Sequence, residues 1–205
     1  MEGTKPVNKK LAAALSGGAV LAMALSACSS GDDNSEKLDA WAKEVCSAVQ
    51  PQAKKIEAAN TAIQKQTSDN STPEDVQKTD SQAFQDMAEA YKAIGAAVQK
   101  AGAPDTGDDA KNAEKKQQDA VKELNSLAAS YASLQKQVDD LNTKDQAKFA
   151  DGLKDIATAL DKLSTSGNDA LRKLEEGDVG KAMAQQESCK SASAAPSAAP
   201  SATTG

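Results

Sequence analysis

Three cysteines, Cys28, Cys46 and Cys189, are the residues of this chain with the most distinctive chemistry. A cysteine thiol can act as a nucleophile, accept an acyl group or form a disulfide. The 205 residues include no histidine. This excludes the commonest general base, the commonest metal ligand and every Ser-His or Cys-His nucleophile pair. We therefore expect the cysteines to serve attachment and cross-linking, and we predict no catalytic residue and no enzyme activity.

The segment before the first cysteine has the layout of a signal peptide. Three lysines within the first ten residues precede an uncharged, largely apolar stretch, Leu11 to Ala27. Its length of about 17 residues is at the lower edge of what a transmembrane helix needs. A basic start, an apolar middle and small residues at the end are typical of an export signal that is removed. We predict that 1–27 is such a signal.

The residues around the first cysteine decide what kind of signal this is. Leu25-Ser26-Ala27-Cys28 resembles the lipobox of bacterial lipoproteins. The resemblance implies cleavage just before Cys28, transfer of a diacylglyceryl group to its thiol, and further acylation, for example with palmitate. Two acyl chains are enough for stable anchoring. The alternatives are an ordinary secretory signal with an incidental cysteine, and an uncleaved anchor. We expect 28–34 to be a lipidated polar linker.

Cys46 and Cys189 remain once Cys28 carries lipid, and an exported chain lies in an oxidising compartment. In the helical bundle argued below, Cys46 lies about 16 Å along a helix that begins at Ser35. A short helix from Asp178 to Ser188 could turn back over the same distance. Because the two heights match, we predict a Cys46–Cys189 disulfide. Two unpaired thiols are the alternative.

Acidic residues offer little evidence of a metal or cofactor site. Carboxylates occur as neighbouring pairs in a linker or at helix ends, where acids favour solubility and capping. A metal site in a helix bundle would need inward Glu with Glu-x-x-His spacing, and the segment PDTGDDAKN only weakly imitates a calcium loop. No nucleophile elbow or phosphate-binding loop is present. We predict no cofactor and no metal. The pairs are Asp32-Asp33, Asp108-Asp109, Asp139-Asp140 and Glu175-Glu176.

The elements that must position the cysteines are long helices. Apolar residues recur at alternating spacings of three and four residues, which indicates amphipathic helices. Pro51 lies inside the first helix, and we expect a kink or break near Gln50. Thr72 and Pro73 form a start signal for the second helix, and Thr143 to Gln146 has the pattern of a capping box for the fourth. The predicted spans are 36–67, 73–101, 108–141 and 144–176.

The matched lengths of these spans, about 43 to 51 Å, predict an all-α fold. Short loops between them favour an antiparallel up-down-up-down four-helix bundle, followed by the short fifth helix. Few aromatic residues and much alanine predict a slim core that benefits from a covalent link. We expect one bundle domain over 35–190 and a disordered Ala/Ser/Pro tail over 191–205, because the tail has no large apolar residue.

The chain as a whole resembles the small secreted lipoproteins of high-GC actinobacteria. The resemblance rests on the lipobox LSAC, on LDAWAKEVCSAVQP from Leu38 to Pro51, and on QESCK from Gln186 to Lys190. It implies a helical domain tethered by lipid to the cell membrane, on its extracellular face. The family has no assigned molecular activity, so the resemblance concerns location and leaves mechanism open.

Three functions remain open from the sequence. The first is a non-enzymatic binding or scaffolding module that contacts an envelope protein. The second is a carrier of a small apolar ligand within the bundle, which an alanine-rich core with few aromatics disfavours. The third is a His-independent hydrolase, for which no motif is present. Nucleic acid is excluded as a partner, because a net charge of -6 repels phosphate backbones.

Overall fold

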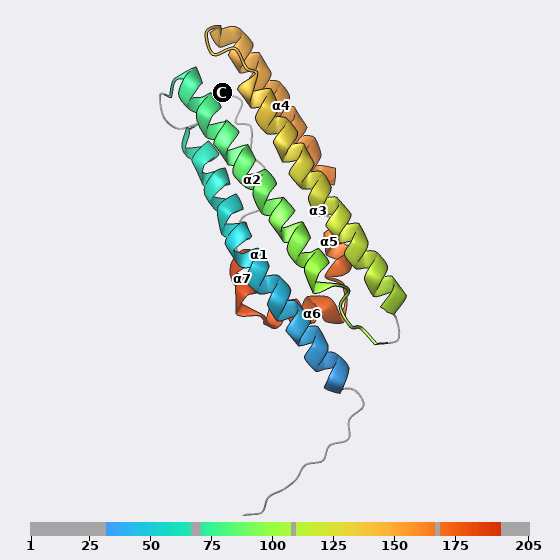
Figure 1. Cartoon of the computed structure of the whole chain (residues 1–205). Coiled ribbons are helices and arrows are strands. Elements are labelled where there is room, and N and C mark those ends of the chain that lie inside the picture. Colours follow the sequence, from blue (N-terminus) through green and yellow to red (C-terminus); the bar gives the residue numbers. More distant parts are fainter. Residues whose placement is uncertain (1–31, 67–70, 108–109, 167–168, 194–205) are drawn as a thin grey trace, which may run out of the picture. The chain divides into compact units, whose positions relative to one another are not determined.

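The computed structural model describes residues 32–66, 71–107, 110–166 and 169–193. The chain divides into two units, and all described residues belong to the second, Gly31–Gly205. Within them every regular element is a helix, which confirms the all-α prediction (Figure 1). Seven helices follow one another in these described ranges. The predicted signal peptide and Cys28 lie outside the described residues.

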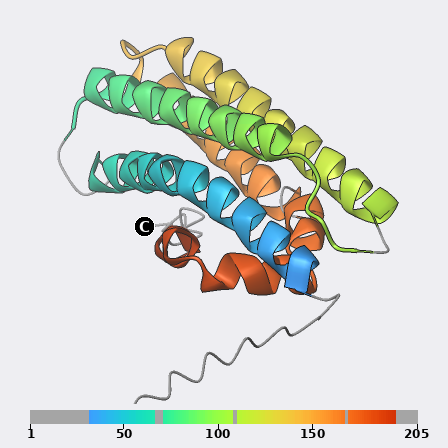
Figure 2. The same cartoon turned by 60° about the horizontal axis from the view of Figure 1, so that its bottom comes forward.

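The first helix, α1 (Asp32–Gln66), is longer than predicted and is not interrupted at Pro51. It begins at Asp32, three residues before Ser35. The predicted break near Gln50 is wrong. Proline removes one backbone hydrogen bond, but buried side chains on both sides of it keep the helix continuous. Figure 2 shows α1 curving along its length.

The second helix, α2 (Pro73–Ala101), has the predicted bounds. At its start, the Thr72 hydroxyl accepts a hydrogen bond from the Asp75 backbone, and the Asp75 carboxylate accepts one from the Thr72 backbone. At its end, Gly102 has a φ of 73°, which favours glycine. Sequence signals at both ends therefore determine where this helix begins and ends.

The third and fourth predicted helices differ in their bounds. The third is α3 (Ala110–Asp139). In place of one helix over 144–176, the structure has α4 (Gln146–Ser166) and α5 (Asp169–Leu174). The predicted capping box is wrong in its residues, because Asp145 caps α4: its carboxylate accepts a hydrogen bond from the Lys148 backbone, 3.2 Å away.

The predicted fifth helix is two helices, α6 (Asp178–Gln185) and α7 (Glu187–Ser193). Gln186 separates them in extended backbone, with ψ of 123°. The N-cap residue of α6 is Gly177, which has no side chain, so no side-chain hydrogen bond caps this helix. The last helix extends three residues into the segment predicted as tail, and the remainder of the tail lies outside the described residues. Both short helices lie along α1 (Figure 2).

Two groups of buried residues form the core. We call the first group the clasp-end core. It joins side chains of α1, α2, α3, α5 and α6: Leu38, Trp41, Ala42, Val45, Ile94, Val98, Ala120, Leu124, Leu174, Val179 and Ala182. The far core joins α1, α2, α3 and α4 and includes Phe84, Met87 and Leu134. Among the long helices, the most extensive packing is between α2 and α3 and between α1 and α2. Each core therefore gathers helices that are distant in the chain.

Candidate functional site

The structure brings together the two cysteines that the sequence predicts to pair. Cys46 from α1 and Cys189 from α7 form a disulfide with their Cα atoms 4.9 Å apart. Cys46 is 0% exposed and Cys189 is 8% exposed. Gln186 lies in extended backbone between α6 and α7, and α7 packs on α1. The bond links residues 143 positions apart in the chain.

Apolar side chains that precede Cys46 along α1 are buried. Leu38, Trp41, Ala42 and Val45 are buried in the clasp-end core. The Trp41 indole N–H donates a hydrogen bond to the Gly102 carbonyl oxygen, 2.8 Å away, and so links α1 to the end of α2. Trp41 is therefore a core residue with its one polar atom satisfied, as the sequence pattern suggested.

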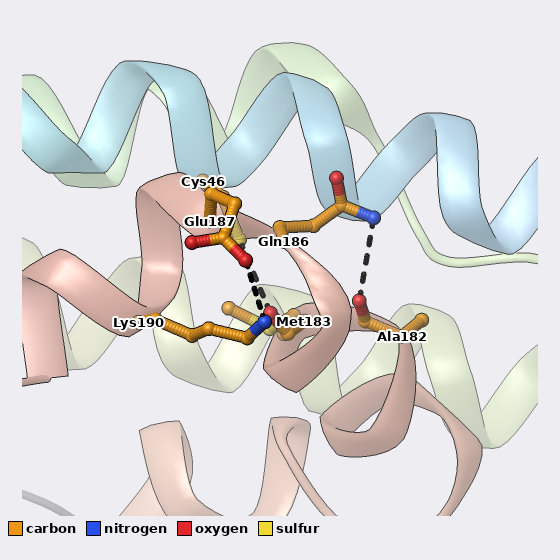
Figure 3. Close-up of polar contacts among 6 residues, drawn as sticks. All are labelled: Cys46, Ala182, Met183, Gln186, Glu187 and Lys190. Carbon is orange, nitrogen blue, oxygen red and sulfur yellow. Dashed lines mark hydrogen bonds and ion pairs between the residues drawn. The ribbon is translucent and has the colours of Figure 1, made fainter.

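The polar contacts near the disulfide in α6 and α7 are short-range. The Lys190 ammonium lies 2.7 Å from a Glu187 carboxylate oxygen, and Gln186 Nε2 donates to the Ala182 carbonyl oxygen at 3.4 Å (Figure 3). Lys181 pairs with Asp178 at 2.8 Å. These three contacts join residues three or four positions apart, so they shape the two short helices rather than attach them to α1.

The acidic pairs do not come together as a ligand set in the described ranges. Asp139-Asp140 and Glu175-Glu176 lie exposed at helix ends, and Glu176 forms an ion pair with Lys116 at 3.3 Å. Asp32-Asp33 lie in the first turn of α1, and Asp108-Asp109 lie outside the described residues. Among the described residues, no three Asp, Glu or Cys side chains gather where they could hold a metal ion.

Asp80 is a buried carboxyl group that the sequence interpretation missed. It is 8% exposed on the inward face of α2, and this burial raises its pKa to about 6. The signal was available, because position 80 continues the three-four spacing of Phe84 and Met87 toward the start of the helix. Gln117 of α3 is also a buried polar residue, and its amide donates to the Val98 carbonyl oxygen at 3.1 Å.

Aromatic residues pack with one another between α2 and α3. The rings of Tyr91 and Tyr131 stack with their centroids 5.4 Å apart. The centroid of the Phe84 ring lies 6.2 Å from that of Tyr131. Burial and the neighbouring Tyr91 hydroxyl raise the pKa of Tyr131. Half-buried tyrosines with raised pKa values stay neutral, so this cluster serves packing.

The described surface has open grooves lined by small and polar side chains. One groove of about 580 Å³ lies between α1 and α2 and is lined by Ala58, Ala62, Gln66 and Lys78, among others. A second of about 760 Å³ lies between the end of α2 and α3, lined in part by Gln99 and Gln118. Both grooves are open to solvent and mix alanine with polar side chains, which suits contact with another protein surface better than enclosure of a small apolar ligand.

None of the described helices is both long and apolar enough to cross a membrane. No family model matches the chain, and no curated protein or solved structure is significantly similar to it.

Proposed function

We propose that this protein is a lipid-anchored module on the outer face of the cytoplasmic membrane, of the kind found in the small secreted lipoproteins of high-GC actinobacteria. The observation that carries the proposal is the position of α1, which begins at Asp32, four positions after Cys28. With so short a connection, lipid on Cys28 would hold the start of a stiff helix of about 52 Å near the bilayer. The protein would then present helix surfaces at a defined distance from the membrane.

We further propose that the four longest helices run up, down, up and down. Consecutive long helices pack against each other, and the segments between them are short. The far core, which unites residues of α1, α2, α3 and α4, supports this arrangement. Short connections make antiparallel neighbours the simplest topology.

The function we assign to the module is non-enzymatic binding or scaffolding of an envelope protein. Its surface supports this, because charged side chains form exposed ion pairs along and between helices, such as Lys37 with Asp105 and Lys100 with Glu44. Exposed pairs contribute about 0 to 1 kcal/mol to stability, so these charges are available for recognition at little cost to the fold. A carrier of a small apolar ligand is the alternative.

Membrane attachment is tested by substituting the proposed lipidation residue. Cys28→Ser should move the protein from the membrane fraction to the soluble fraction, because the thioether to lipid can no longer form. Cys46→Ser is the matched control: it removes a different thiol and should leave the protein on the membrane. Fractionation with immunodetection reads out both variants. Retention of Cys28→Ser on the membrane would contradict lipid anchoring at this residue.

Partner binding is tested by photo-crosslinking in living cells. A benzophenone amino acid at Ala58, which lines the α1–α2 groove, should crosslink to one envelope protein. The same amino acid at Ala157, an exposed alanine of α4, is the matched control and should not. Crosslinks at Ala157 alone would show that the groove is not the binding surface. If neither position crosslinks and an apolar small molecule co-purifies, the carrier function replaces the binding function.

A further inference from the structure

The last two helices form a segment that is attached differently from the rest of the fold. We call residues 178–193 (α6 and α7) the C-terminal strap. Its helices have 8 and 7 residues, whereas an isolated helix needs about 12 to 15 residues to be even marginally stable. The strap packs on α1, and its helices pack on each other. Its structure therefore depends on staying in contact with α1.

The non-covalent contacts that hold the strap are small. Val179 and Ala182 are its buried residues in the clasp-end core, and Met183 is partly buried against that core. The ion pairs of Lys181 and Lys190 lie within α6 and within α7 respectively, so they add nothing to the attachment. The Cys46–Cys189 disulfide is the strong link between the strap and α1.

The strap begins after Gly177, which can act as a hinge. Gly177 has a φ of +72°, a conformation that glycine adopts without strain, and no atom lies within 4 Å of the place that a Cβ would occupy. Open space around a flexible residue allows the chain to change direction there.

We propose that the strap is a redox-sensitive element: reducing the Cys46–Cys189 disulfide releases it from α1 while the long helices stay packed. Release uncovers an apolar face of α1 that includes Leu38, Ala42 and Val45, which are 6%, 0% and 2% exposed in the closed state. The far core contains no strap residue, so its packing does not depend on the bond. This inference is independent of lipid anchoring.

The reductant is a dithiol. One of its thiolates attacks the sulfur of Cys189, the more exposed partner, and forms a mixed disulfide while Cys46 leaves as a thiolate. The second thiol of the reductant then attacks the mixed disulfide, which frees Cys189 and closes a disulfide within the reductant. Two electrons pass to the protein, and the two protons of the dithiol end on Cys46 and Cys189.

Hydrogen–deuterium exchange on the purified protein, with and without dithiothreitol, tests the proposal. Reduction should raise amide exchange over residues 178–193 at least tenfold and to near the rate of an unstructured peptide, whereas residues 83–90 of α2, beside the far core, should stay protected. In the reduced native protein, iodoacetamide should also label Cys46, which is fully buried in the closed state. Cys189→Ser should show the same open strap without reductant. Cys28→Ser, which leaves the bond intact, should stay closed.

Three results would overturn the proposal. If dithiothreitol does not reduce the native protein, the element is not redox-sensitive. If the reduced protein and Cys189→Ser both keep slow exchange over 178–193 and an unlabelled Cys46, packing alone holds the strap. If residues 83–90 lose their protection together with the strap, the bond supports the whole fold rather than one segment.

Discussion

Asp80 is a carboxyl group on the buried face of α2, and burial raises its pKa to about 6 from an ordinary value of 3.8. The folded protein therefore holds the Asp80 proton more tightly than the unfolded chain does. The tighter binding of this proton favours folding most below pH 4, and this stabilisation is lost as the pH rises through 6. Above that pH the charged carboxylate destabilises the fold by an upper figure of about 3 kcal/mol.

We predict that Asp80→Asn raises the free energy of unfolding at pH 7.5 by about 1 to 3 kcal/mol and changes it little at pH 4, because the amide is neutral at both. Urea denaturation at the two pH values measures this. Glu89→Gln, an acid-to-amide change at an exposed position of the same helix, is the control and should have a small effect at both. An equal effect of Asp80→Asn at pH 4 and pH 7.5 would show that ionisation is not the cause.

Sequence pattern predicted some individual residues and missed others for identifiable reasons. The pairing of Cys46 and Cys189 could be predicted for two reasons. An exported chain lies in an oxidising compartment, and the rise of a helix places the two cysteines at the same height. Asp80 was missed because an acid on an apolar stripe is ordinarily assigned to solvent, and only the packed neighbours reveal its burial. The cap of α4 was placed at Thr143 because a sequence motif cannot distinguish it from Asp145, two residues later.

At the scale of elements, the start of α2 depends on its capping box. Thr72 and Asp75 satisfy two backbone N–H groups there, and the bond from the Thr72 side chain lowers the pKa of Asp75. Thr72→Ala should reduce the free energy of unfolding by about 1 kcal/mol, measured by urea denaturation. Thr61→Ala removes a hydroxyl from an exposed position on α1 and should have a smaller effect. Equal losses in both variants would show that the cap is not the cause.

The helices could be predicted to the extent that their ends carry local signals. The bounds of α2 were predicted because Pro73 and Gly102 mark both ends. The division into α6 and α7 at Gln186 has no glycine or proline to mark it and follows from packing on α1. Continuity of α1 through Pro51 was not predictable from propensity, because burial on both sides of the proline outweighs the lost hydrogen bond.

For the whole molecule, the disulfide closes a long loop around an alanine-rich core. The chain-entropy estimate for a separation of 143 residues is about 5 kcal/mol, an upper figure because unfolded chains retain structure. Proteins usually have free energies of unfolding of about 5 to 15 kcal/mol, so the disulfide contributes a large share of the stability. Cys46→Ser and Cys189→Ser should each lower the Tm by several degrees in calorimetry, and the double variant should match either, because all three lack the same bond.

A double variant with a Tm well below both single variants would contradict that prediction. It would mean that each cysteine side chain also contributes to packing on its own.

The fold class and the closed loop were predictable from helical periodicity and cysteine spacing. Which helix faces meet in each core was not, because alanine-rich stripes fit several packing arrangements about equally well.

We propose an exported helical domain that is anchored by lipid on Cys28 and closed by the Cys46–Cys189 bond. Intact mass spectrometry of the protein extracted from membranes and alkylated without reductant tests it most directly. We predict a chain that begins at Cys28, carries acyl groups on that residue and has no alkyl label on Cys46 or Cys189. A chain that retains residues 1–27, an unacylated Cys28, or alkyl labels on both remaining cysteines would contradict the account.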